Sequence, residues 1–376
     1  MHNLTDIRKQ FPITQSMTYL DSSRMVPPPR CVMDSVTSFF DDIHAGGENR
    51  PDLEQKAEDA LKRFARIINA MPEEVVFIKN TTEGLNIAAN GLPLKSGDNV
   101  VITDLEHLNN VYPWTNLQET KGVEVRILKS RDGRLHVEDL EKLVDRRTRA
   151  LSLSFVTFTG LRIDLKRFGR FCRAHDIFLV VDGIQGVGRI NLDVKDSLVD
   201  IMACGGHKGL MAGRGIGCLY IDKRIIDSVA VTFAGPPLEV RHAQVSTELV
   251  RSAGAGKFNA GGANYLGICA LQASLKFLEE IGLDTIETQD LDLEKRLIEG
   301  LRPVRGLDIL SPKVPEESSG IVLIGTADNS RLAKGLEQNK IRVSSRGSGI
   351  RVAPHFFNTE EEIDKAVSVI AGLHSG

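Results

Sequence analysis

The feature that most limits the fold is a regular alternation of short apolar runs with helix-like segments, which begins near residue 53. Alternation of this kind is typical of βαβ units, in which a crossover helix joins each strand to the next parallel strand. The sequence therefore predicts an α/β fold built on a largely parallel sheet. The strand-like runs are rich in β-branched and aliphatic residues and occupy residues 75–78, 99–103, 123–128, 150–155, 177–181 and 215–221.

The order of elements changes after a long amphipathic segment at 265–281. Beyond it the pattern predicts helices at 291–301 and 330–339, a strand at 319–325, short strands near Arg342 and Arg351, and a closing helix from Glu360. We expect a large domain at 18–275 and a small α+β domain at 276–376, which the N-terminal segment 1–17 joins.

Composition and charge favour small-molecule chemistry. The 47 basic and 50 acidic residues give a net charge of −3, without a long basic run, so no nucleic-acid partner is expected. The chain begins with charged residues and has no apolar run of membrane-spanning length, which predicts a cytoplasmic protein without a membrane partner. Five scattered cysteines predict reduced thiols, and the histidine spacing favours no metal site.

Polar residues that could catalyse a reaction or bind a ligand follow the ends of successive strand-like runs. In an open α/β sheet, the loops at the carboxyl ends of the strands converge on one crevice, where ligands bind. We therefore interpret these residues as parts of a single site. They are Thr81 and Thr82, Glu106 and His107, Thr157 to Thr159, Asp182 with Gln185, and His207 with Lys208.

Each of these residues also has an ordinary structural interpretation. Asn80 and Glu83 suit a helix-capping box, although free N–H groups and the hydroxyls of Thr81 and Thr82 equally suit a phosphate. Asp182 suits a turn or cap. It also suits the nitrogen of a pyridine ring, because an opposite charge keeps that nitrogen protonated.

Lysine and histidine are open to the same two interpretations. Most lysines are solvated surface charges, but Lys208 stands among Gly206, His207, Gly209 and Leu210. A lysine in a desolvated pocket loses part of its preference for the charged form and becomes nucleophilic, as a Schiff-base amine must be. His107 is either a structural loop residue or a flat ring that stacks on a cofactor and carries protons.

Taken together, these segments resemble the class V aminotransferase and cysteine desulfurase superfamily of fold-type I pyridoxal-phosphate enzymes. The resemblance covers nearly the whole chain. It rests on Tyr19-Leu20-Asp21-Ser22-Ser23, Asn80-Thr81-Thr82-Glu83-Gly84-Leu85-Asn86, Glu106-His107 with Pro113-Trp114, Val181-Asp182-Gly183-Ile184-Gln185, Gly206-His207-Lys208 with Gly215-Ile216-Gly217, and the segment from Phe357 to Asp364.

The resemblance implies a seven-stranded, mainly parallel large domain, pyridoxal 5′-phosphate as cofactor, an amino-acid substrate and a homodimer. It implies that Lys208 forms the internal aldimine, that Asp182 pairs with the pyridine nitrogen and that Gln185 bonds the ring hydroxyl. By the same resemblance, His107 stacks on the ring, Thr81, Thr82 and His207 hold the phosphate, and Ser22 and Arg351 contact the substrate. Arg351 takes the α-carboxylate, and the alternative is that Arg346 is the anchor while Arg351 forms a structural ion pair.

Four departures from desulfurases bear on the reaction. Gly205 stands where they often carry Ser, Phe158 stands where they commonly carry Asn, and 259–264 lacks their usual Ala-Gly-Thr-Pro stretch. Segment 343–351 is short and holds no cysteine, whereas a desulfurase places its persulfide-forming cysteine there. An aminotransferase-like enzyme is our first hypothesis. The alternatives are a cysteine or cystine C–S lyase that works by β-elimination, an amino-acid epimerase, and a scaffold without activity, which the retained Lys208, Asp182 and Gln185 disfavour.

Overall fold

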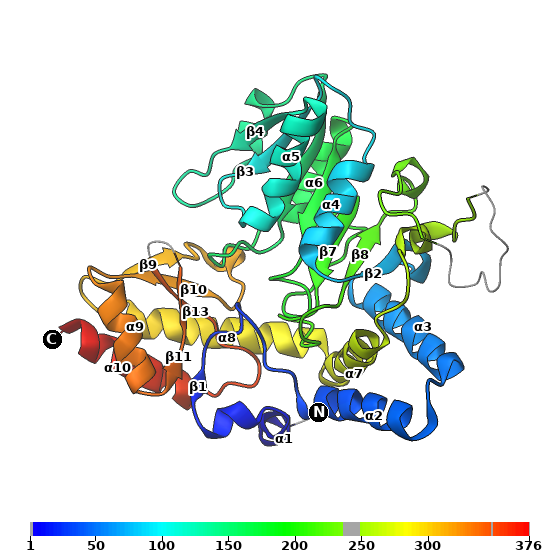
Figure 1. Ribbon diagram of the computed structural model, residues 1–376. Coiled ribbons are helices and arrows are strands. Elements are labelled where there is room, and N and C mark those ends of the chain that lie inside the picture. The colour runs from blue at the N-terminus through cyan, green and yellow to red at the C-terminus, as the bar shows by residue number, and fades with distance from the viewer. Residues whose placement is uncertain (1–2, 236–248, 347–348, 376) are drawn as a thin grey trace.

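The computed structural model describes residues 3–235, 249–346 and 349–375, which form a large and a small sheet with helices around them (Figure 1). The large sheet has seven strands in the order β2-β8-β7-β6-β5-β3-β4. Only β8 runs antiparallel to its neighbours, so the predicted seven-stranded, mainly parallel sheet is confirmed. The strands are β2 (Val75–Ile78), β3 (Asn99–Thr103), β4 (Glu124–Leu128), β5 (Thr148–Ser154), β6 (Phe178–Asp182), β7 (Ile201–Gly205) and β8 (Gly217–Ile221).

Both faces of the large sheet are buried, because successive side chains on a strand point to opposite faces. In β6, Val180 packs into the core on one face, whereas Leu179 and Val181 pack into the core on the other. Such strands are apolar on both sides, which explains why they appear in the sequence as continuous apolar runs. The first core includes α4 (Thr81–Gly91) and α5 (Tyr112–Lys121), and the second includes α3 (Arg50–Ile67), α6 (Leu165–Ala174) and α7 (Tyr265–Ile281).

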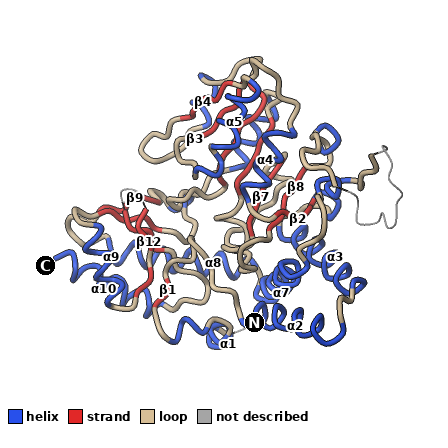
Figure 2. Tube along the Cα trace, in the orientation of Figure 1, coloured by secondary structure: helices blue, strands red, loops and turns tan. Residues whose placement is uncertain are grey.

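The small domain has its own sheet and core. Its four strands lie in the order β12-β13-β10-β9, and Figure 2 shows them apart from the large sheet. Three helices cover this sheet with a separate apolar cluster that includes Leu297, Leu336 and Ile363. The elements are α8 (Leu283–Leu301), β9 (Asp308–Ser311), β10 (Val322–Gly325), α9 (Asn329–Gln338), β11 (Ile341–Arg342), β12 (Ser344–Arg346), β13 (Gly349–Val352) and α10 (Glu360–Ser375).

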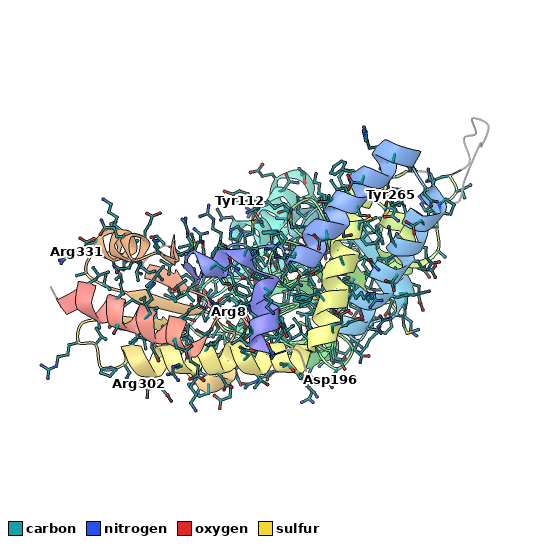
Figure 3. The ribbon with its side chains drawn as sticks, turned by 90° about the horizontal axis from the view of Figure 1, so that it is seen from below. Arg8, Tyr112, Asp196, Tyr265, Arg302 and Arg331 are labelled. Atoms are coloured by element: carbon teal, nitrogen blue, oxygen red, sulfur yellow. The ribbon has the colours of Figure 1, made fainter. Side chains whose placement is uncertain are left out.

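The N-terminal segment packs against the C-terminal part of the chain. The short strand β1 (Thr18–Tyr19) pairs in parallel with β11, and Asp21 forms an isolated bridge with Ala353. In helix α1 (Leu4–Lys9), Arg8 donates to the Phe357 carbonyl at 2.7 Å and pairs with Glu362 at 3.0 Å (Figure 3). These contacts place residues 21–24 beside β13, at the edge of the site described below.

Some element boundaries differ from those predicted. Helix α8 begins at Leu283 rather than at 291, and α4 begins at Thr81 rather than at Glu83. Helices α1 and α2 (Arg30–Gly46) were not predicted, since α2 carries many exposed residues and buries only Val32 fully. The expected domain boundary at 275/276 lies inside α7, a single helix. Among the described residues, no helix is both long enough and apolar enough to span a bilayer.

Candidate active site

A cavity of about 240 Å³ opens at the carboxyl edge of the large sheet, between that sheet and the small domain. It collects residues from seven separate stretches of sequence, and most of these stretches lie where the sequence predicts strand ends. The residues that line it are Ser23, Arg24, Thr81, His107, Asn109, Ser154, Val156, Phe158, Asp182, Ile184, Gln185, His207, Lys208, Arg214, Arg346 and Arg351.

Lys208 and Asp182 are the lysine and the aspartate that line the sheet side of this cavity. Asp182 is the last residue of β6, 3% exposed, and its Oδ1 accepts the backbone N–H of Ile184 at 3.0 Å. Burial raises the pKa of the Asp182 carboxyl, and the charge of Lys208 opposes that rise. Burial lowers the pKa of Lys208 to about 8, against the opposing effect of Asp182. A lysine of this kind is partly neutral near physiological pH, as a nucleophilic amine requires.

The glycine pair before Lys208 lets β7 pass very close to α4. The N–H of Gly205 donates to Thr81 Oγ1 at 3.0 Å, so this hydroxyl fills the space that a side chain at position 205 would need. A Cβ on Gly206 would lie 2.9 Å from the Ile216 carbonyl oxygen. Close packing therefore requires glycine at 206, whereas a side chain at 205 would need Thr81 to shift by a few tenths of an ångström.

The start of α4 is capped as the sequence predicts, with one difference. The Asn80 side chain accepts the N–H of Glu83 at 3.0 Å, whereas the Glu83 carboxylate accepts the N–H of Lys79 rather than that of Asn80. The first turn of α4 begins at Thr81, which lines the cavity, and the N–H groups at the start of a helix favour an anion. Capping and anion binding are compatible here, because they use different N–H groups.

His107 is held by a buried glutamate beside it. Glu106 accepts hydrogen bonds from Thr103 Oγ1 and Asn110 Nδ2, both at 2.8 Å, and from the backbone and hydroxyl of Ser154. These bonds fix the loop that presents His107. Burial lowers the pKa of His107, so its ring is neutral at pH 7. Its Nδ1 accepts the N–H of Asn109 at 3.2 Å, which places the ring proton on Nε2.

His207 and Gln185 complete the sheet side of the cavity. Burial lowers the pKa of His207 to about 4, with a smaller effect from Lys208, so this ring is neutral over the physiological range. Gln185 is 6% exposed and follows Asp182 in the same loop. The cavity therefore joins Thr81, His107, Asp182, Gln185, His207 and Lys208, as the single-site interpretation expects.

Arg351 reaches the cavity from β13 of the small domain. It is 2% exposed, and its Nη1 donates to the Phe158 carbonyl at 3.0 Å while its Nη2 lies 3.4 Å from Ser344 Oγ. Its Nε is buried and has no hydrogen-bond partner. Arg346 lies on the neighbouring strand β12 and also lines the cavity. Arg351 forms no ion pair with another described residue, so the structural ion pair considered for it is not seen.

Two of the predicted site residues lie outside the cavity lining. Thr82 is half-buried on α4, and its carbonyl accepts the Asn86 side chain at 2.9 Å. Ser22 is buried, donates to the Ala353 carbonyl at 2.8 Å and accepts a bond from Arg189. Ser22 thus joins the two domains behind the cavity, and Ser23 faces the cavity in its place.

Five polar lining residues were not singled out from the sequence as site residues: Ser23, Arg24, Asn109, Ser154 and Arg214. Arg24 and Arg214 had a usable signal. Arg214 stands between two glycines shortly after Lys208, and Arg24 directly follows the Asp21-Ser22-Ser23 segment. A charged residue in a loop next to a proposed catalytic lysine is a good candidate for ligand contact.

The comparisons with known proteins agree with this geometry. The profile of the aminotransferase class-V family matches residues 18–367. The chain belongs to this family. A probable cysteine desulfurase of Pyrococcus abyssi is 30% identical over 98% of this class V chain and 97% of its own length. This class V chain is similar in fold to the apo cysteine desulfurase of Thermococcus onnurineus, with a TM-score of 0.91 and 28% identity. The match covers 100% of this chain and 99% of the Thermococcus chain.

A third relative is similar in fold. It is a cystine C–S lyase solved with its reaction product cysteine persulfide, with a TM-score of 0.89, 22% identity, and coverage of 96% and 99%. The class V chain is a pyridoxal 5′-phosphate enzyme with cysteine desulfurases among its relatives, and a cystine C–S lyase shares its fold.

The site residues fit pyridoxal 5′-phosphate. The cofactor needs an amine for its aldehyde, a carboxylate for its pyridine nitrogen and donors for its phosphate. The cavity offers Lys208, Asp182, and the α4 start with Thr81 and His207, and only Asp182 among the lining residues is acidic. These residues would hold the cofactor at the sheet side of the cavity.

Proposed function

We propose that this class V enzyme breaks and forms bonds at Cα of an α-amino acid, in the manner of an aminotransferase. The observation that carries the proposal is the pairing of Lys208 with Arg351. The lysine amine and the arginine, whose buried Nε has no partner, open on the same small cavity from different domains. One group suits proton transfer, and the other suits an α-carboxylate.

Pyridoxal 5′-phosphate, when bound, withdraws electrons from the bonds at Cα of an amino acid joined to it. Lys208 is the base nearest to that chemistry. With a pKa lowered to about 8, roughly a tenth of its amines are neutral at pH 7 and able to take the Cα proton. Asp182 is positioned to hold a proton on the ring nitrogen by its opposite charge.

The remaining residues position and orient. His207 and His107 are neutral at pH 7, because burial lowers both pKa values. A neutral imidazole can donate one hydrogen bond to a phosphate or lie flat on a ring without adding charge beside Lys208. Arg351 would fix the α-carboxylate and so select which Cα bond is cleaved.

The decisive test follows the Cα proton itself. The purified enzyme with its cofactor is incubated with a panel of amino acids in D₂O, with and without 2-oxo acids. We expect exchange of the Cα proton, and conversion to a keto acid beyond one equivalent per cofactor only when a 2-oxo acid is present to accept the amino group. Absence of exchange with every amino acid, in protein that has bound cofactor, would contradict the proposal.

A second candidate reaction is β-elimination from cysteine or cystine. None of the five cysteines lines the cavity, and Cys204, Cys218, Cys172 and Cys269 are buried. An elimination at a C–S bond needs the base but no protein thiol, and one structural relative is a C–S lyase. In the same panel, this reaction would release pyruvate and a sulfur species without any 2-oxo acid. An epimerase would instead give exchange with racemisation.

We also propose that two copies of the chain associate as a homodimer. Large apolar side chains are exposed on the single chain, among them Phe40 at 55% and Tyr112 at 63%. Exposed aromatic side chains of this size are typical of interaction surfaces. Light scattering should give twice the mass of the 41.3 kDa chain. A Phe40→Asp variant tests whether α2 takes part.

A further inference from the structure

The cavity has two sides with different chemistry. The sheet side carries the residues that suit the cofactor. The other side, the donor wall, consists of Ser23, Arg24, Arg346 and Arg351. These residues lie close together because Asp21 bridges Ala353, next to β13, and β12 pairs with β13. The donor wall contains hydrogen-bond donors and positive charges but no acidic side chain.

The donors of this wall lack partners within the described part of the chain. Ser23 is 2% exposed, and its Oγ has no hydrogen-bond partner. The buried Nε of Arg351 has none either. Arg24 and Arg346 form no ion pair with any described residue, and Arg346 donates only to the carbonyl of Ser345. Ser23 Oγ and Arg351 Nε are buried, and buried polar groups without partners are costly and mark a place where a ligand supplies the partners. Arg24 is exposed and Arg346 is half-buried, so solvent reaches both guanidinium groups and they can turn to a ligand.

The positive charges also act on one another. Burial, together with the charges of Arg346 and Arg24, lowers the pKa of Arg351 to about 10. The carboxyl of Asp21 opposes this, but it lies behind the wall, burial raises its pKa, and it does not line the cavity. The guanidinium groups of Arg24, Arg346 and Arg351 therefore repel one another, and an anion bound among them relieves this repulsion.

A single α-carboxylate does not use all of these donors. One carboxylate has two oxygens, which one planar guanidinium matches with two parallel bonds. Arg351 fills that role in the function proposed above. Arg214 is a separate case, because it acts on His207 at the sheet side, whose pKa its charge lowers. Arg24, Arg346 and the Ser23 hydroxyl are left for another acceptor.

We propose that the substrate is an α-amino acid whose side chain carries a second anionic group, a carboxylate or a phosphate, held by Arg24 and Arg346. This inference rests on the proposed function, since it assigns Arg351 to the α-carboxylate. The Ser23 hydroxyl donates to the same second group. A neutral side chain of the same shape leaves both guanidinium groups without an acceptor and binds more weakly.

The test compares acids with their neutral isosteres by titration calorimetry on the enzyme with its cofactor. The pairs are L-aspartate with L-asparagine, L-glutamate with L-glutamine, and O-phospho-L-serine with L-serine, so that the two kinds of anion are separated. We expect one acid to bind roughly 10- to 100-fold more tightly than its neutral partner. In Arg24→Gln and Arg346→Gln, this ratio should fall by about tenfold in at least one variant.

Arg302→Gln is the matched control, because it removes one positive charge from the exposed C-terminal end of α8 (Figure 3) and Arg302 does not line the cavity. Its ratio should equal that of the native enzyme. Equal binding of acids and their neutral partners would overturn the inference, as would a preference that survives in both cavity variants. If no amino acid binds at all, the proposed function fails with it, whereas tight binding of neutral amino acids alone leaves that function standing.

Discussion

At the scale of single residues, Lys208 carries the most specific expectation. Its amine has a pKa of about 8 instead of the usual 10.5, because burial disfavours the charged form. The neutral amine is the nucleophile that captures the aldehyde of the cofactor. Uptake of pyridoxal 5′-phosphate by the cofactor-free protein should therefore speed up as pH rises, with a midpoint near 8. Stopped-flow absorbance measures this rate, and a midpoint near 10.5 would show that the amine is not desolvated.

Replacing this lysine separates its role from folding. Lys208→Ala should lose the covalent capture of the cofactor and reduce Cα proton exchange by roughly 10²- to 10⁴-fold. Lys365→Ala, on the exposed face of α10, is the matched control and should behave as the native enzyme. A borohydride-fixed label on another lysine in the native protein would exclude Lys208 as the attachment point.

Arg351 should bind every amino-acid substrate through its carboxylate, whatever the side chain. Arg351→Lys keeps the charge but loses the planar fork, so affinity should fall by roughly 1.5–3 kcal/mol for acidic and neutral amino acids alike. The cofactor absorbance should stay unchanged. Calorimetry with both kinds of amino acid measures the loss. Arg346→Lys is the comparison: a general loss there, with Arg351→Lys unaffected, would transfer the α-carboxylate to Arg346.

At the scale of elements, the hairpin of β12 and β13 decides one part of the chemistry. Arg346 pairs with Gly349, so only two residues connect these strands, and none between Ser344 and Val352 is a cysteine. Persulfide chemistry needs a thiolate that reaches the substrate sulfur. We predict that incubation with L-cysteine gives no persulfide on the protein. Mass spectrometry after alkylation checks this.

Cys204 is the thiol to examine as a control. It precedes Lys208 by four positions, but it is fully buried on β7 and burial raises its pKa well above the usual value. If the enzyme releases sulfur from cysteine, Cys204→Ser should therefore release it at the same rate as the native enzyme. A persulfide that forms on the native protein and disappears in one Cys→Ser variant would show that a thiol elsewhere takes the desulfurase role.

The elements also show what a sequence can and cannot reveal. The strands of the large sheet were predictable because their burial on both faces leaves uninterrupted apolar runs, as in 177–181. Helix α4 was predictable from Asn80 as its cap. Helix α2 was missed although Val32, Val36, Phe39 and Ile43 recur at helical spacing and form an apolar stripe, of which only Val32 is fully buried. Arg24 was missed because its place in the site depends on the distant pairing of Asp21 with Ala353.

At the scale of the whole molecule, one buried ion pair joins the two domains. Arg189 follows β6 in the large domain and pairs with Asp290 of α8 at 3.1 Å, with both side chains at most 3% exposed. It also donates to the carbonyls of Gly320 and Pro354 and to Ser22. A charge left alone in such a place is far more costly than the loss of the pair as a whole.

Arg189→Met should therefore destabilise the protein by about 3–5 kcal/mol, because the buried Asp290 keeps only the His355 ring at 2.9 Å, whose pKa burial lowers. The double variant Arg189→Met with Asp290→Leu should recover a large part of that loss. Urea denaturation of the cofactor-free protein measures both. A double variant no more stable than the single one would show that the hydrogen bonds to Ser22, Gly320 and Pro354 matter more than the charge pair.

The pairing of β1 with β11 has a consequence for how the chain matures during synthesis. Thr18 finds its partner Ile341 more than three hundred residues later, and Arg8 finds Glu362 later still. At about 5–20 residues per second, a ribosome needs roughly 16–65 seconds to make that intervening stretch. The first twenty residues must wait for that time without their final neighbours. The donor wall, which needs both ends of the chain, is among the last parts of the protein to form.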